Sequence, residues 1–117
     1  MGQRASRVAE ELRKVITRVL LEELSNPKLG FVTVTKVLVT DDLRMGKIYY
    51  SVLGNEEQKS ATEEALTEEL PSIRRLVAQQ LDMRYAMEIR FELDPSIDDS
   101  FRIDDILKKI NKKDKEL

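Results

Sequence analysis

The chain is organised around Asn26-Pro-Lys-Leu-Gly-Phe-Val-Thr-Val-Thr-Lys-Val-Leu-Val39, continued by Thr40-Asp-Asp-Leu-Arg-Met-Gly-Lys-Ile-Tyr-Tyr-Ser-Val52. Its residues 31–39 and 47–52 are two runs rich in Val, Thr, Ile and Tyr, and a polar segment separates them. Because β-branched and aromatic residues favour strands, this arrangement predicts a β-hairpin. The other elements have to pack around that hairpin.

Side chains alternate along both runs, which predicts a sheet buried on one face and open on the other. In the second run, the apolar face carries Ile48, Tyr50 and Val52. The opposite face carries Lys47, Tyr49 and Ser51. In the first run, we expect Val32, Val34 and Leu38 on one face and Thr33 and Thr35 on the other.

Helical periodicity marks two further regions. Residues 4–24 repeat apolar side chains at three- and four-residue spacing, which predicts a long amphipathic helix that ends before Pro27. A second helix, capped by Asn55 or by Ser60, reaches residue 69, where Pro71 predicts a break or kink. A third helix over residues 72–83 then begins with Pro71 in its first turn.

A third strand over residues 87–93 follows, because Ile89, Phe91 and Leu93 alternate with charged residues. A short helix over residues 103–110 completes a single domain of residues 1–111, and a Lys-rich tail spans 112–117. The order predicts an α+β fold, a three-stranded mixed sheet with helices on one face. Two sets should pack together: Val32, Val34, Ile48, Tyr50, Ile89 and Phe91, and Val8, Leu12, Val15, Ile73, Val77 and Leu81.

Composition excludes several kinds of chemistry. The chain of 117 residues has no Cys and no His, which rules out disulfides, thiolate metal ligands and an imidazole general base. No apolar run approaches the length of a membrane span, and residues 1–6 lack the apolar core of a secretory signal. We therefore expect a cytoplasmic protein without a membrane partner.

Charge is unevenly distributed although the formal net charge is only −2. Residues 3–20 hold five basic and two acidic side chains, whereas residues 55–70 hold six Glu and one Lys. At the angular spacing of a helix, the cations Arg4, Arg7, Lys14 and Arg18 form one stripe beside the apolar face. This stripe either solvates an exposed helix face or binds an anionic partner.

The chain resembles a known family in the order of its motifs. The motifs that carry the resemblance are residues 7–13, 26–34, 42–51, 73–77, 83–94 and 102–107. The element order resembles the type II KH domain, an RNA-binding fold, and the ordered motifs are similar to the ribosome-binding factor A family. Like the family, the chain lacks the Gly-x-x-Gly pair of classical KH domains, which the family replaces with a kink. Two departures from the family are visible: Glu69-Leu70-Pro71 stands where its kink usually has a small residue, and Ala86-Met87 stands where it commonly has a Pro before the third strand.

The resemblance implies a monomeric maturation factor, with no enzymatic activity and no cofactor. Such a factor docks on the free 30S subunit, contacts 16S rRNA and assists its late processing and assembly, including cold adaptation, alongside other assembly factors. The candidate RNA-binding residues are Arg4, Arg7, Lys14, Arg18, Lys28, Lys47, Arg74, Arg75 and Arg84.

Two alternatives start from other residues. The acidic group Asp94, Asp98, Asp99, Asp104 and Asp105 could hold Mg²⁺ or Ca²⁺, but it lacks the spacing of an EF-hand, and a solvated loop with helix caps explains it better. The Glu-rich second helix or an exposed sheet edge could instead recruit a protein, without direct RNA binding.

Overall fold

The computed structural model describes residues 2–83 and 85–94. Helix α1 (Gln3–Arg18) continues into a π-helical turn, η1 (Val19–Glu23), and strands β1 (Phe31–Val39) and β2 (Met45–Leu53) follow. Helix α2 (Glu56–Leu81) then leads to strand β3 (Glu88–Leu93). The expected helix over residues 103–110 and the tail lie outside the described residues.

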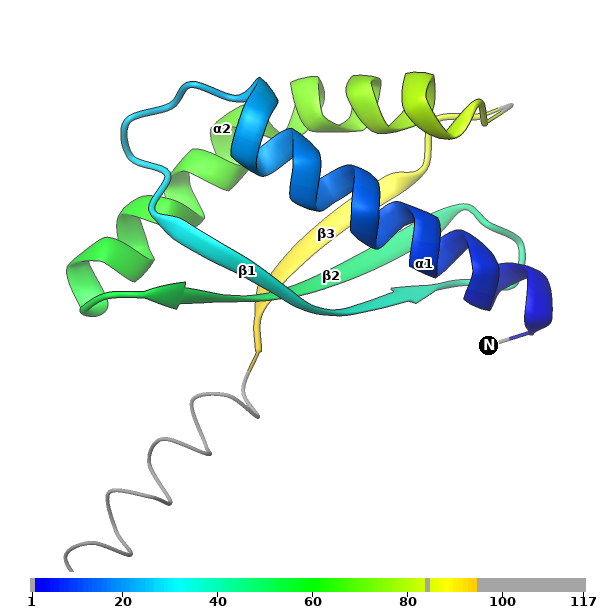
Figure 1. The fold of residues 1–117 in the computed structure, drawn as a ribbon, viewed down its shortest axis with the longest axis horizontal. Coiled ribbons are helices and arrows are strands. Elements are labelled where there is room, and N and C mark those ends of the chain that lie inside the picture. Colours follow the sequence, from blue (N-terminus) through cyan, green and yellow to red (C-terminus); the bar gives the residue numbers. More distant parts are fainter. Residues whose placement is uncertain (1, 84, 95–117) are drawn as a thin grey trace, which may run out of the picture.

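The sheet is mixed, as predicted, with the strand order β1-β2-β3. Strand β2 pairs antiparallel with β1 and parallel with β3. Both helices lie on the same side of this sheet, and the other face is left without a helix among the described residues (Figure 1). The predicted α+β architecture is therefore confirmed.

A β-bulge changes the facing of side chains along β1. Val34 pairs with Tyr50, and Lys36 already pairs with Tyr49, so Thr35 has no partner residue in the register. Since one extra residue reverses the alternation, Val37 and Val39 face the core, and Leu38 pairs with Lys47 on the open face. The predicted burial of Leu38 together with Val32 and Val34 is wrong for this reason.

The core forms where α1 and α2 cross the buried face of the sheet. Leu12, Ile48, Ile73 and Ile89 are among its fully enclosed side chains. The predicted packing set is confirmed in composition, although five of its members are only partly buried: Val8, Val32, Val34, Leu81 and Phe91.

Tyr50 is the largest enclosed side chain of this core. The ring of Phe91 meets that of Tyr50 edge to face, with centroids 6.1 Å apart. Burial, followed by the charge of Glu63, raises the pKa of the Tyr50 hydroxyl to about 12, so this phenol stays neutral at physiological pH. Tyr50 therefore serves the core and not the open face.

Helix α2 corrects the prediction of two helices separated at Pro71. It is continuous from Glu56 to Leu81, with Pro71 well inside it, and it changes direction along its length (Figure 1). Pro71 removes one backbone donor, but apolar side chains on both sides of it remain buried in one core, so packing offsets the lost hydrogen bond. The start of the helix is settled by a reciprocal capping box between Asn55 and Gln58.

Candidate RNA-binding surface

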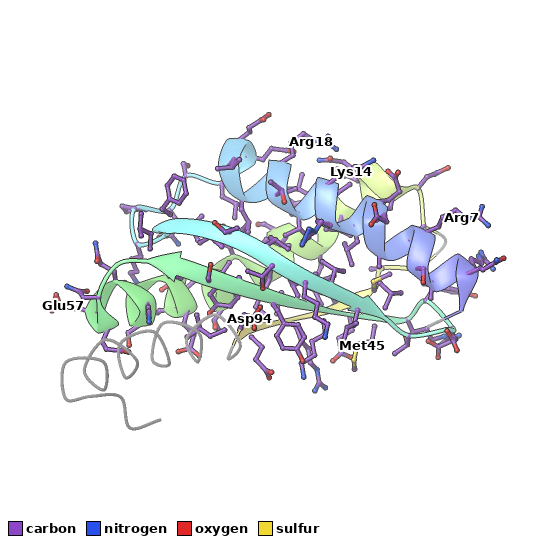
Figure 2. All side chains as sticks on the ribbon, turned by 60° about the horizontal axis from the view of Figure 1, so that its bottom comes forward. Arg7, Lys14, Arg18, Met45, Glu57 and Asp94 are labelled. Carbon is purple, nitrogen blue, oxygen red and sulfur yellow. The ribbon has the colours of Figure 1, made fainter. Side chains whose placement is uncertain are left out.

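The basic stripe lies on α1 because the opposite side of that helix is buried. Ala5, Ala9, Leu12, Val15 and Ile16 face the sheet. The four predicted stripe residues are all exposed, and Figure 2 shows three of them along the outer side of the helix: Arg7, Lys14 and Arg18. The structure thus brings together the four cations that helical spacing predicts on one stripe.

The stripe residues differ in how far their charges are already used. Within the described part of the chain, Arg4 and Arg7 make no side-chain hydrogen bond or ion pair. Lys14 has one weak pair, 3.9 Å from Glu11, between two well-exposed side chains. Arg18 is held more firmly, since its guanidinium donates to Gln80 Oε1 at 2.8 and 3.3 Å.

A shallow depression of about 490 Å³ accompanies the stripe. Arg4, Arg7 and Lys14 line it from α1, and Leu81 and Met83 line it from the end of α2. The carboxylates of Glu10 and Glu11 also border it. Cations over a partly apolar floor suit an anionic partner that also presents flat or apolar groups, as RNA does. Leu81 and Met83 were not predicted here, because only the crossing of α2 beside α1 places them next to the arginines.

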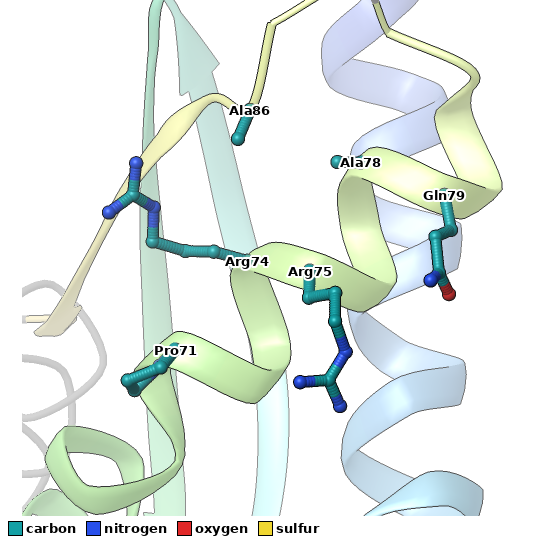
Figure 3. A pocket seen from close by; sticks show the side chains of 6 residues that line it. All are labelled: Pro71, Arg74, Arg75, Ala78, Gln79 and Ala86. Carbon is teal, nitrogen blue, oxygen red and sulfur yellow. The ribbon is translucent and has the colours of Figure 1, made fainter.

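Arg74 and Arg75 border a second depression, of about 580 Å³, together with Pro71 and Gln79. Figure 3 shows their side chains pointing in different directions. Arg74 donates from Nε to the backbone oxygen of Met87 at 3.2 Å, which fixes it against the approach to β3. Arg75 is exposed and makes no hydrogen bond or ion pair with a described residue. Of the two, Arg75 has its charge free for a partner.

Lys28 is a cation that the structure keeps apart from the stripe. Its Nζ lies 2.7 Å from a carboxylate oxygen of Glu64 and 2.7 Å from one of Glu68 on α2. The hydrogen bond to Glu64, which has the largest effect, and the one to Glu68 raise the pKa of the Lys28 ammonium above its ordinary value. Asn26 donates to Glu68 and Glu69 beside it. Lys28 therefore fastens the loop before β1 to α2, with its charge already compensated.

Lys47 lies on the open face of the sheet, away from the stripe. Its ammonium is 5.2 Å from the centre of the Tyr49 ring and 3.5 Å from a Glu92 oxygen. The hydrogen bond with the Tyr49 side chain, and after it the negative charge of Glu92, raise the pKa of the Lys47 ammonium above its ordinary value. The last candidate, Arg84, lies outside the described residues.

Arg13 is a partly buried cation of α1 for which the helical pattern predicted no specific role. Its Nη2 donates to the backbone oxygens of Thr35, at 2.7 Å, and Val34, at 3.4 Å. Across the sheet, Thr35 donates from Oγ1 to Asp94 Oδ2 at 2.5 Å. The bulge of β1 is thus held from both faces. No sequence signal marks the bulge, so this role could not be inferred from the chain.

Neither a metal site nor a membrane span is found in the described ranges. Residues 2–83 and 85–94 contain no cluster of three or more Asp or Glu side chains placed to hold a metal ion. Of the predicted acidic group, only Asp94 falls in those ranges. None of their helices is both long and apolar enough to cross a membrane.

Two comparisons with known proteins agree with each other. Ribosome-binding factor A of Caldanaerobacter subterraneus subsp. tengcongensis is 42% identical over 115 residues, which cover 97% of this chain and 94% of the relative. A solution structure of a Thermotoga maritima protein, described as a ribosome binding factor A, is 31% identical with a TM-score of 0.68, covering 79% of this chain and 88% of that one.

A third comparison concerns the fold alone. Coordinates of the Thermus thermophilus ribosome binding factor A, fitted into an electron cryo-microscopy map of its complex with the 30S subunit, give a TM-score of 0.61 at 20% identity. They cover 74% of this chain and 90% of that one. The family model described as ribosome-binding factor A matches residues 4–107. By this match and by the identity to its relatives, the chain belongs to the ribosome-binding factor A family.

Proposed function

We propose that this protein binds the free 30S subunit, contacts 16S rRNA with the basic stripe of α1, and assists late rRNA processing and assembly, including in the cold. Membership of a family named for ribosome binding supports the proposal. So does the fold shared with a ribosome binding factor A that was fitted into a map of a 30S complex. We further propose that it acts as a monomer in the cytoplasm, alongside other assembly factors, by binding and without catalysis.

The observation that carries the proposal is the pair of uncompensated arginines, Arg4 and Arg7, beside an apolar floor. An arginine can grip a phosphate with two parallel hydrogen bonds, whereas a lysine offers a point charge. Arg75 on α2 would add a third free guanidinium. Arg18 is already bonded to Gln80, so it would contribute mainly through its charge.

The test is sedimentation with purified small subunits across a salt series, using Arg4→Glu combined with Arg7→Glu. We expect this variant to lose binding at physiological salt, because two phosphate contacts become repulsive. Folding should not suffer, since both positions are exposed and Arg4 lies in the first turn of α1, where a carboxylate interacts favourably with the helix dipole.

The matched control reverses two exposed cations on the open face, Lys36→Glu with Arg90→Glu. It changes the net charge by the same amount but leaves the stripe intact. We expect it to bind small subunits nearly as the parent does. Equal binding by the stripe variant and the parent, with unchanged thermal melts, would exclude α1 as the docking surface. Equal loss in both variants would mean that only the total charge matters.

A further inference from the structure

Strand β1 presents a free edge beside α1. Among the described residues it pairs only with β2, so on its outer side the N–H and C=O groups of every second residue point away from the sheet. Apart from the bond that Val34 accepts from Arg13, residues 31–34 receive no hydrogen bond on this edge from any described residue. Such an edge can accept another extended chain through backbone hydrogen bonds.

The bulge limits how long that free edge is. Arg13 bonds to the carbonyl oxygens of Val34 and Thr35, and the strand is irregular between Val34 and Lys36. A chain pairing with β1 would therefore have to end near Val34. The available edge is Phe31 to Val34, which matches a segment of about four residues in an extended conformation.

An apolar groove of about 280 Å³ runs along this same edge. Leu21 and Thr17 form its wall on the helical side, and Phe31, Val32 and Val34 form the wall on β1. Leu21 is 66% exposed and Phe31 is 68% exposed. Two of the four large apolar side chains left exposed in the described residues thus flank one groove, and the π-helical turn η1 carries one of them.

The charges around the groove indicate what it can bind. The opposite flank of α1 carries the free arginines, whereas the cation in the groove, Arg13, is already engaged by two carbonyl oxygens. A phosphate backbone would find no free positive charge here, but an extended polypeptide would find backbone partners and apolar walls. We propose that β1 binds a short extended segment of a protein, with alternating apolar side chains, as an added strand.

This inference goes beyond the proposed function, and it assigns the two flanks of α1 to two kinds of partner. One flank would contact RNA and the other a protein strand, so both could be engaged at once on a particle made of RNA and protein. A second copy of this chain is the competing occupant of the edge, and the test separates the two.

The first arm places a photoreactive benzophenone amino acid at Thr17 or, in a matched protein, at Glu11 on the opposite flank. Both proteins are irradiated on purified small subunits. We expect the Thr17 probe to cross-link to a protein of the subunit and the Glu11 probe to rRNA. Cross-links from Thr17 only to RNA, only to a second copy of this chain, or to nothing while Glu11 reacts, would overturn the inference. Failure of both probes would count against subunit docking, and the second arm alone would then decide.

The second arm needs no ribosome. The labelled protein is titrated in nuclear magnetic resonance experiments with a short peptide of alternating Val and Thr, and with the same peptide carrying a central Pro. We expect amide shifts confined to β1 and the groove, and none with the Pro peptide, which lacks a backbone donor. Leu21→Ala with Phe31→Ala should weaken binding by about tenfold or more. Leu53→Ala, which removes an exposed apolar side chain that lies opposite Phe31 on β2 but does not line the groove, should weaken binding far less. No shift in β1, or equal shifts with both peptides, would overturn the inference.

Discussion

The cations of α1 and the cation that faces α2 carry the same charge but have opposite uses. Arg4 and Arg7 project from α1 with no partner among the described residues, whereas Lys28 lies 2.7 Å from two carboxylates of α2. Both helices cover the same face of the sheet (Figure 1). What separates them is the composition of the neighbouring helix, since α2 carries six Glu residues and α1 carries two.

We infer from this difference that a basic residue can contribute to a docking surface only when the fold leaves its charge uncompensated. Lys28 and Arg7 both carry a positive charge, and both are exposed. A salt-bridged lysine must break its existing pairs before it can bind phosphate, while a free arginine loses only water. We therefore expect the two groups to respond differently to mutation, salt and pH.

The largest effect should come from neutralising the stripe. Replacing Arg4, Arg7 and Lys14 with Ala removes three cations that can each bind a phosphate. The slope of the logarithm of the binding constant for small subunits against the logarithm of salt concentration should fall by about 0.7–0.9 for each phosphate that is no longer bound. Filter binding or sedimentation over a salt series measures it. An unchanged slope would show that these side chains do not meet phosphates.

The next prediction compares how closely α1 and α2 pack against the sheet. At Gly46, a Cβ atom would lie 2.8 Å from Leu12 Cδ2 and 2.9 Å from Met87 Sδ. Gly46→Val should therefore overpack the core and lower the free energy of unfolding by about 1–3 kcal/mol.

Gly30, near α2, provides the matched comparison, because its Cβ would meet Thr62 Oγ1 at 3.0 Å. Gly30→Val should cost less than Gly46→Val, by about 1 kcal/mol or more. Urea unfolding of both variants decides the order. A smaller loss at Gly46 than at Gly30 would contradict the close approach of α1.

Replacing Pro71 should have a smaller effect of the opposite sign. Pro71 is exposed inside a continuous helix, so Pro71→Ala restores a backbone donor and favours the helix by up to about 3 kcal/mol. Packing contacts that are lost when the helix straightens reduce this gain. We expect a higher melting temperature and more helical circular dichroism. A lower melting temperature would mean that the bend is needed to bury the second half of α2.

The smallest effect should come from Lys28→Met. The pair is exposed, so the melting temperature should fall only slightly, and small-subunit binding should remain that of the parent. Lys28, followed by Asn26, lowers the pKa of Glu68, and a carboxyl with a lowered pKa in the folded state stabilises the fold at neutral pH.

That stabilisation is lost as the pH falls through the lowered pKa of Glu68. The difference in melting temperature between the parent and Lys28→Met should therefore shrink in acid and in high salt. Thermal melts between neutral pH and about pH 3 measure this trend. A difference that grows on acidification would show that Lys28 does not act through the two carboxylates. Loss of subunit binding in this variant would show that Lys28 belongs to the docking surface.

Local patterns along the chain were enough to predict the sheet, the long first helix and the stripe on it. Alternation at a period of two and apolar spacing near 3.6 residues are local properties, so they place Ile48 and Ile89 in the core and Arg7 outside it without knowledge of the fold. The order of the elements then limited how three strands could pair, which is why the mixed sheet was predictable.

Local patterns could not predict the bulge at Thr35, the continuity of α2 through Pro71 or the compensation of Lys28. Each depends on residues far apart in the chain: Arg13 reaches the bulge from α1, and Glu64 and Glu68 reach Lys28 from α2. Burial on both sides of Pro71 outweighs a local preference for a break. Local patterns fix which face a side chain takes, whereas contacts across the fold fix whether its charge or its backbone edge remains free.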